Sequence, residues 1–163
     1  MGKAIFITFF AFVFYLTEFI LFNTIGGYFK PNLLLLLVIF ANFAFGIRFS
    51  IVAAVICGFL QDSFSTSIFG ISFLSYILCA YAVTVLSRIA NLRGRMFSRL
   101  WIVFCVVSIN VILQFFLHLI FVQTSIKHVF LHIYLPEVIT TLLVTNMTFG
   151  FLKSCVSKLY TSL

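Results

Sequence analysis

The segment GFLQDSFSTSIFG, residues 58–70, interrupts an otherwise apolar chain with polar residues and a carboxylate. Asp62 is one of only three acidic residues in the sequence, and it is preceded by Gln61 and followed by a run of hydroxyl residues. Long apolar segments on both sides predict two helices joined at a polar turn. We expect Asp62 to cap backbone N–H groups of this turn, because aspartate accepts such hydrogen bonds at turns and helix starts. Lys30 is an expected ion partner.

The composition places the chain in a membrane. Hydrophobic residues make up 64% of the sequence and charged residues 8%, against about a quarter charged in soluble domains. The mean hydropathy of +1.28 agrees with this assignment. The apolar runs are continuous rather than alternating, which argues against a transmembrane β-barrel. We therefore expect residues 1–163 to form a single integral membrane domain.

The apolar runs predict an all-α polytopic fold with six transmembrane helices. The second and third runs are short and meet around Gly46 and Arg48, so they form either a thin hairpin or a re-entrant pair. The first run is longer than a signal-peptide core and lacks a small-residue cleavage site after it, which predicts a retained signal anchor. The expected spans are about 4–22, 31–47, 49–61, 68–87, 100–122 and 136–152.

The basic residues predict the orientation, because cytoplasmic loops of membrane proteins are enriched in lysine and arginine. With six crossings and a cytoplasmic N-terminus, eight of the ten basic residues are cytoplasmic, and only Lys30 and Lys127 are not. Both termini are therefore expected in the cytoplasm. This topology explains the net charge of +7 without any binding of nucleic acid.

Four arginines gather in one expected cytoplasmic loop, RIANLRGRMFSR, residues 88–99. One interpretation is topology together with contact to anionic lipids, to which each such cation contributes about 1 kcal/mol. The other interpretation is a docking site for a cytoplasmic partner. The four residues are Arg88, Arg93, Arg95 and Arg99.

Polar side chains recur at helical spacing along the last two spans. They either form hydrogen bonds between helices or line a small polar pocket for a solute or a lipid headgroup, and both interpretations stay open. These residues are Asn110, Gln114 and His118 in the fifth span and Thr141 and Thr145 in the sixth.

Catalytic, metal and disulfide chemistry find little support in the sequence. His128 and His132 are four residues apart but lack a third ligand nearby, and an interfacial helix is the alternative to a metal site. The sequence contains no phosphate-binding loop, nucleophile elbow or evident carboxylate pair, so we expect neither an enzyme nor a cofactor. The four cysteines, at positions 57, 79, 105 and 155, form no C-x-x-C pair. We expect them to serve as small apolar residues rather than as disulfide or metal-binding residues.

Three packing expectations follow from the spans. Small residues line one face of the third span and one face of the fourth, which predicts a tight hairpin. Pro136 and Glu137 open the last span, where a carboxylate meets the positive end of the helix dipole and needs no other partner. The first span offers an inner face of Thr8, Ala11, Tyr15 and Glu18.

Residues 30–78 resemble the MreD family of bacterial rod shape-determining membrane proteins. The family usually has Pro-Asp ahead of a leucine run, where this chain has Pro31-Asn32. The glycine at position 46 and the order and spacing of the residues in 58–70 also match. The resemblance implies a structural corner that presents a surface to a partner, formed by Pro31, Asn32, Gly58, Gln61, Asp62 and Gly70.

The resemblance implies a non-enzymatic scaffold of the cell-elongation machinery in the bacterial cytoplasmic membrane, which supports peptidoglycan synthesis and cell shape. The implied direct partner is an MreC-type protein, whose single transmembrane helix we expect in a lateral groove. MreB, RodA and a class-B penicillin-binding transpeptidase are implied as indirect partners. The family's fold is similar to that of the substrate-binding subunits of energy-coupling-factor transporters.

That similarity also supplies the alternative function, a substrate-binding subunit of a vitamin transporter of this type. Such a subunit would use the polar residues of the last two spans as its solute pocket. These subunits often present an Ala-x-x-x-Ala surface to their transport partner, and this spacing does not occur in the sequence.

Overall fold

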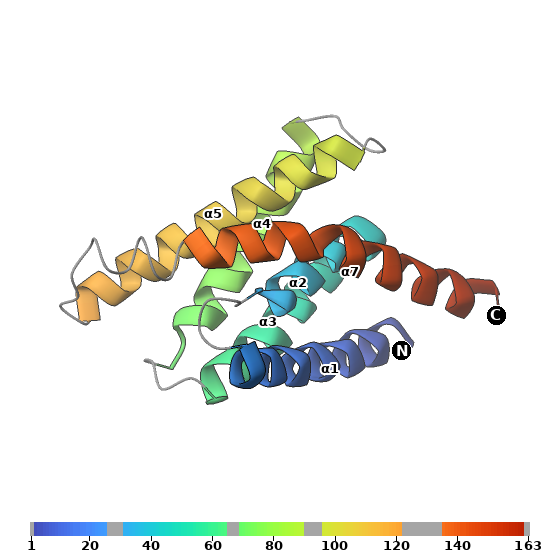
Figure 1. Ribbon diagram of the computed structural model, residues 1–163. Helices are drawn as coiled ribbons and strands as arrows, with labels where there is room; N and C mark the ends of the chain where they lie inside the picture. The colour runs from blue at the N-terminus through green and yellow to red at the C-terminus, as the bar shows by residue number, and fades with distance from the viewer. Residues whose placement is uncertain (1, 26–30, 65–68, 90–95, 122–134, 162–163) are drawn as a thin grey trace.

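The computed structural model describes residues 2–25, 31–64, 69–89, 96–121 and 135–161. Each of the six predicted apolar runs corresponds to one helix, which confirms an all-helical architecture for the described residues (Figure 1). The second expected span is too long, because residues 31, 32 and 46 are not helical and residue 47 begins the next helix. The last helix continues well beyond its expected end at residue 152. The helices are α1 (Gly2–Ile25), α2 (Leu33–Phe45), α3 (Ile47–Phe64), α4 (Ile71–Ile89), α5 (Met96–Phe121) and α7 (Leu135–Thr161).

Three of the described helices are long and apolar enough to cross a membrane, over Lys3–Thr24, Ile71–Ile89 and Pro136–Ser157. Two shorter apolar helical segments, Leu33–Phe45 and Leu100–Phe116, accompany them. With 13 residues, α2 is about 20 Å long, which is less than the roughly 30 Å thickness of a bilayer core. The structure thus supports a multi-pass membrane protein.

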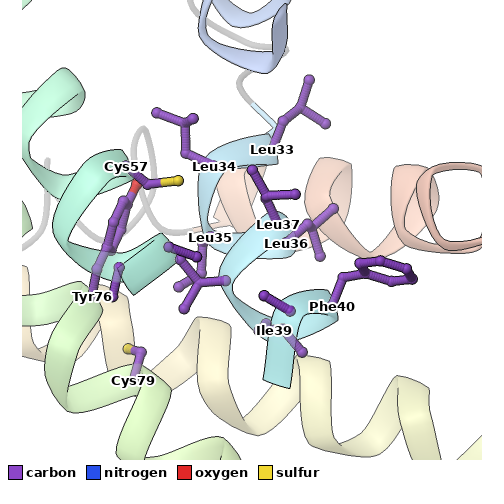
Figure 2. Packing of buried hydrophobic residues seen from close by; sticks show 14 of the residues in the cluster. Leu33, Leu34, Leu35, Leu36, Leu37, Ile39, Phe40, Cys57, Tyr76 and Cys79 are labelled. Atoms are coloured by element: carbon purple, nitrogen blue, oxygen red, sulfur yellow. The ribbon is translucent and has the colours of Figure 1, made fainter. Parts of the chain in front are cut away.

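The short helix α2 is the centre of the bundle. Every residue from Leu33 to Asn42 is buried, as expected for a helix that is hydrophobic on all sides. Its leucines project toward several neighbouring helices, with Cys57 of α3 and Tyr76 of α4 close by (Figure 2). The helices α1, α3, α4, α5 and α7 all pack against it. The position of α2 therefore fixes the positions of the other helices.

The helices α3 and α4 form the tight hairpin that their small residues predicted. A Cβ atom added at Gly58 would lie only 2.5 Å from the Cα atom of Phe73. The two backbones can approach this closely only because residue 58 has no side chain. Ala53, Ala54 and Cys57 of α3 are fully buried beside it.

The expected inner face of α1 is partly wrong. Ala11 is fully buried, but Thr8 is exposed and donates its hydroxyl hydrogen to the carbonyl of Ala4 in its own helix. Aromatic residues occupy the inner face instead, and Phe10 packs against Phe151 of α7. Three of the seven phenylalanines in the expected span 4–22 are therefore core residues: Phe6, Phe10 and Phe14.

Candidate functional site

Asp62 caps the start of α4, although it belongs to the end of α3. Its Oδ2 atom accepts hydrogen bonds from the backbone N–H groups of Gly70 and Phe73, both at 2.9 Å. Its Oδ1 atom accepts a third from Ser72 at 3.0 Å. The carboxylate is 3% exposed, so its charge is compensated by these donors and by the helix dipole. The cap predicted from the sequence is present, but it acts on the first residues of α4.

The neighbours of Asp62 complete the corner between α3 and α4. Gly70 has φ of +103°, a left-handed conformation that favours glycine. The Oε1 atom of Gln61 is buried and accepts no hydrogen bond from the described residues. The expected ion partner of Asp62, Lys30, lies outside the described residues. The role of this corner in binding a partner therefore stays a prediction.

Asn32 organises a second cap, at the start of α2. Its Oδ1 atom accepts hydrogen bonds from the N–H of Leu35 at 2.9 Å and from the hydroxyl of Tyr76 at 2.9 Å. Its Nδ2 atom donates to Glu137 Oε1 at 3.0 Å. Its backbone N–H donates to Thr141 Oγ1, also at 3.0 Å. A single residue thus ties α2 to α4 and α7.

Glu18 reaches the same helix start from α1, where its Oε1 atom accepts a hydrogen bond from the N–H of Leu34 at 3.0 Å. Two carboxylates from distant parts of the sequence therefore converge on the first residues of α2. The expectation that Glu137 needs no partner is wrong, because Glu137 is 5% exposed and bonded to Asn32. We call this group the α2 cap cluster; it consists of Glu18, Asn32, Tyr76, Glu137 and Thr141.

The sequence did not reveal the α2 cap cluster. Glu18 and Glu137 are separated by most of the chain, and no motif connects them. The available signal was the leucine run after Asn32, because a fully buried helix must satisfy its first N–H groups internally. Asp62 and the two carboxylates of this cluster, Glu18 and Glu137, all accept hydrogen bonds from backbone or amide N–H groups. The role described for these three residues is therefore structural.

The predicted polar pocket stays a prediction. Asn110 is fully buried and its Oδ1 atom accepts a hydrogen bond of 2.6 Å from Ser75 of α4. Its Nδ2 atom has no acceptor among the described residues. Thr141 belongs to the α2 cap cluster, and Thr145 donates to the carbonyl of Thr141. These hydrogen bonds lie between two helices or within one helix. Gln114 is half-buried, and the side chain of His118 lies outside the described residues.

Other predicted features fall partly outside the described residues. His128 and His132 are among these, as are Arg93, Arg95 and the side chain of Arg99. Among the residues that the structure does describe, no group of three histidine, cysteine or acidic side chains could hold a metal ion. The four cysteines are free.

Basic and acidic side chains lie toward opposite ends of the helix bundle. The ammonium group of Lys3 lies over two aromatic rings that flank the turn between α2 and α3, at 5.4 and 5.3 Å from their centroids. At the end of α2, the amide of Asn42 donates to Thr84 of α4, and both chain termini lie at the same end of the molecule (Figure 1). The basic residues with described side chains are at this end: Lys3, Arg48, Arg88 and Lys153. The acidic residues all lie toward the opposite end.

A lateral hollow of about 510 Å³ opens between α5 and α7. All of the residues that line it are apolar, and two of them are well exposed, Trp101 at 57% and Leu143 at 71%. The sequence predicted a lateral groove but not its position, because no motif distinguishes these residues from other apolar ones. We call this hollow the α5–α7 groove; it is lined by Leu100, Trp101, Phe104, Leu142 and Leu143.

Comparisons with known proteins identify the family. A family model described as rod shape-determining protein MreD matches residues 2–155. No curated protein and no solved structure matches the chain, so the expected likeness to energy-coupling-factor subunits gains no support. The family match extends far beyond residues 30–78, on which the sequence resemblance rested. The chain therefore belongs to the MreD family, the multi-pass membrane proteins of the cell-elongation machinery that determine rod shape without enzymatic activity.

Proposed function

We propose that this protein is the membrane scaffold that binds an MreC-type partner, whose transmembrane helix lies in the α5–α7 groove. The observation that carries this proposal is the combination of a lateral apolar hollow with walls that buried hydrogen bonds hold in place. A binding surface that is already formed loses little conformational entropy when its partner arrives.

Both walls of the groove are fixed to the centre of the bundle. The start of α7 is held to α2 by the bonds of Asn32 with Glu137 and Thr141. The helix α5 is held to α4 by the bond between Ser75 and Asn110. In a bilayer, such packing and hydrogen bonding stabilise helix contacts, since lipid removes the hydrophobic driving force. The caps therefore serve the partner surface indirectly, by setting its shape.

Trp101 is the side chain of the groove that we expect to contribute most. Large aromatic residues at the centre of an interface often provide a disproportionate share of its binding energy. Leu143 faces it from α7 and supplies the opposite wall. The corner around Asp62 would contact the partner where its helix leaves the membrane, which combines capping with recognition.

We further propose six crossings with both termini in the cytoplasm. The separation of charges supports this orientation, because the end that carries the basic residues is the end expected to face the cytoplasm. That end would contact anionic lipids or MreB. RodA and the class-B transpeptidase would associate through the partner.

Co-purification with the partner tests this function. Trp101→Ala should weaken recovery of the MreC-type protein roughly 30-fold, equivalent to about 2 kcal/mol of binding energy. Tyr81→Ala is the matched control, because Tyr81 is an aromatic residue of α4 that is 63% exposed away from the groove. Equal recovery with both variants would contradict the groove assignment. A bound vitamin and a stoichiometric transporter partner would instead support the alternative function.

A further inference from the structure

Asn146 is a polar residue in an apolar setting. It lies in α7 at the middle of the membrane-crossing segment Pro136–Ser157, and its side chain is exposed on the surface of the bundle. Within the described part of the chain, its amide makes no hydrogen bond. At the middle of a bilayer it would face hydrocarbon, where an unsatisfied amide is costly.

Three threonines in the membrane-crossing helices satisfy their hydroxyl groups locally. Thr8 and Thr17 of α1 each donate the hydroxyl hydrogen to a carbonyl four residues earlier, and Thr148 of α7 does the same. A hydroxyl on a short side chain can reach its own helix in this way. Asn146 does not form such a bond, so its amide is available to a group outside the described chain.

Gly150, four residues after Asn146, lies on the same outward face of α7. A Cβ atom added there would meet nothing within 4 Å, so no packing within the described chain requires glycine at this position. Glycine is nevertheless among the weakest helix formers. Ser154 follows four residues later and is exposed as well, which gives the spacing of small residues through which membrane helices approach closely. The unpaired amide and the unexplained glycine thus indicate the same face.

We infer that this face of α7 packs against α7 of a second copy of the chain, with Asn146 of each copy bonded to Asn146 of the other. All copies in a membrane share one orientation, so equivalent residues lie at equal depth. A side-chain amide both donates and accepts, and two identical amides on a two-fold axis satisfy each other. A different partner would need a polar group at this same depth, whereas a second copy always provides one.

This inference does not depend on the binding of MreC. The α5–α7 groove uses Leu142 and Leu143 of α7. Asn146 follows Leu142 by four residues, so the dimer contact, which centres on Asn146, Gly150 and Ser154, continues along the same side of α7. Its test uses the purified protein alone, without MreC.

Dimerisation of the purified full-length protein in liposomes, measured by single-molecule photobleaching over a range of protein densities, tests the inference. Asn146→Leu should weaken association roughly threefold to twentyfold, the range measured for hydrogen bonds between membrane helices. Gly150→Leu should weaken it as well, because a bulky residue keeps the helices apart. Asn23→Leu, a matched change at an exposed asparagine near the end of α1, should leave it unchanged.

Asn146 is exposed and a Cβ atom at position 150 would meet nothing within 4 Å, so neither variant should lower the thermal stability of the monomer. A wild-type protein that is monomeric at every density would overturn the inference. Association that both α7 variants leave intact would do so too. In cells, photocrosslinking from position 147 should give the homodimer, and crosslinks only to a different protein would reject a second copy as the occupant of this face.

Discussion

The side-chain amide of Asn32 donates to Glu137 over 3.0 Å and joins the start of α2 to the start of α7, although 105 residues separate them in the sequence. This bond requires a donor at position 32. The resemblance described above implies aspartate at this position in the MreD family, and aspartate has no amide to offer. Asn32 and Glu137 therefore form a matched pair in this chain.

Asn32→Asp should destabilise the protein by roughly 2–3 kcal/mol, because it replaces a donor with a second carboxylate facing Glu137 in a buried position. Thermal unfolding in detergent or nanodiscs measures the change. The double variant Asn32→Asp/Glu137→Gln should recover most of the loss, since the glutamine amide can donate to the new carboxylate. Equal stability of the single and double variants would show that the pair is not coupled.

Asp62→Ala should lower the free energy of unfolding by about 3 kcal/mol, because it leaves three buried or half-buried N–H groups at the start of α4 without an acceptor. Ser63→Ala is the control, since the hydroxyl of Ser63 is exposed and bonds only to its own helix. Expression level and unfolding midpoint report the difference. A stable Asp62→Ala protein that no longer retains the MreC-type partner would instead assign the residue to recognition.

Two glycines should respond in opposite ways to the same change. Gly58→Ala should cost about 1–3 kcal/mol, because the new methyl group would clash with the backbone at Phe73. Gly150→Ala should stabilise the isolated monomer by up to about 1 kcal/mol through better helix propensity, since its surroundings are open. Unfolding of both variants side by side in detergent checks this, and a harmless Gly58→Ala would be incompatible with the close approach of α3 and α4.

The proposed orientation predicts which end of the bundle is reached from outside the cell. In a background with Cys105 and Cys155 replaced by serine, Phe69→Cys should react with a membrane-impermeant maleimide on intact cells, because Phe69 is exposed at the acidic end. Arg48→Cys should react only after permeabilisation. The reverse pattern of labelling would invert the topology.

The sequence was sufficient to locate the helices and the cap at Asp62. Apolar runs mark helices in any membrane chain, and the polar turn after Asp62 offered its side chain nearby donors. The tight α3–α4 hairpin was also predictable, since Gly58 and its small neighbours share one helical face. The number of crossings was less certain from the sequence, because a helix as short as α2 can be buried in protein as easily as it can cross a membrane.

The α2 cap cluster and the groove depend on tertiary structure. Glu18 and Glu137 both reach the start of α2 only because α1 and α7 pack against that helix, and no local pattern encodes that arrangement. Thr8 was misplaced for a related reason, since its hydroxyl is satisfied within α1 and need not face the interior. Trp101 is the only tryptophan in the sequence, but no motif places it in a groove rather than on another membrane-facing surface.

The account stands on the α5–α7 groove as the seat of the partner's transmembrane helix. A photocrosslinking scan in cells tests it, with the reactive residue at Trp101, Phe104 or Leu143 in the groove, and at Phe12 or Tyr81 on other exposed faces. We expect crosslinks to the MreC transmembrane helix from the groove positions and none from Phe12 or Tyr81. Crosslinks only from Phe12 or Tyr81, or none from any of the five positions, would contradict the account.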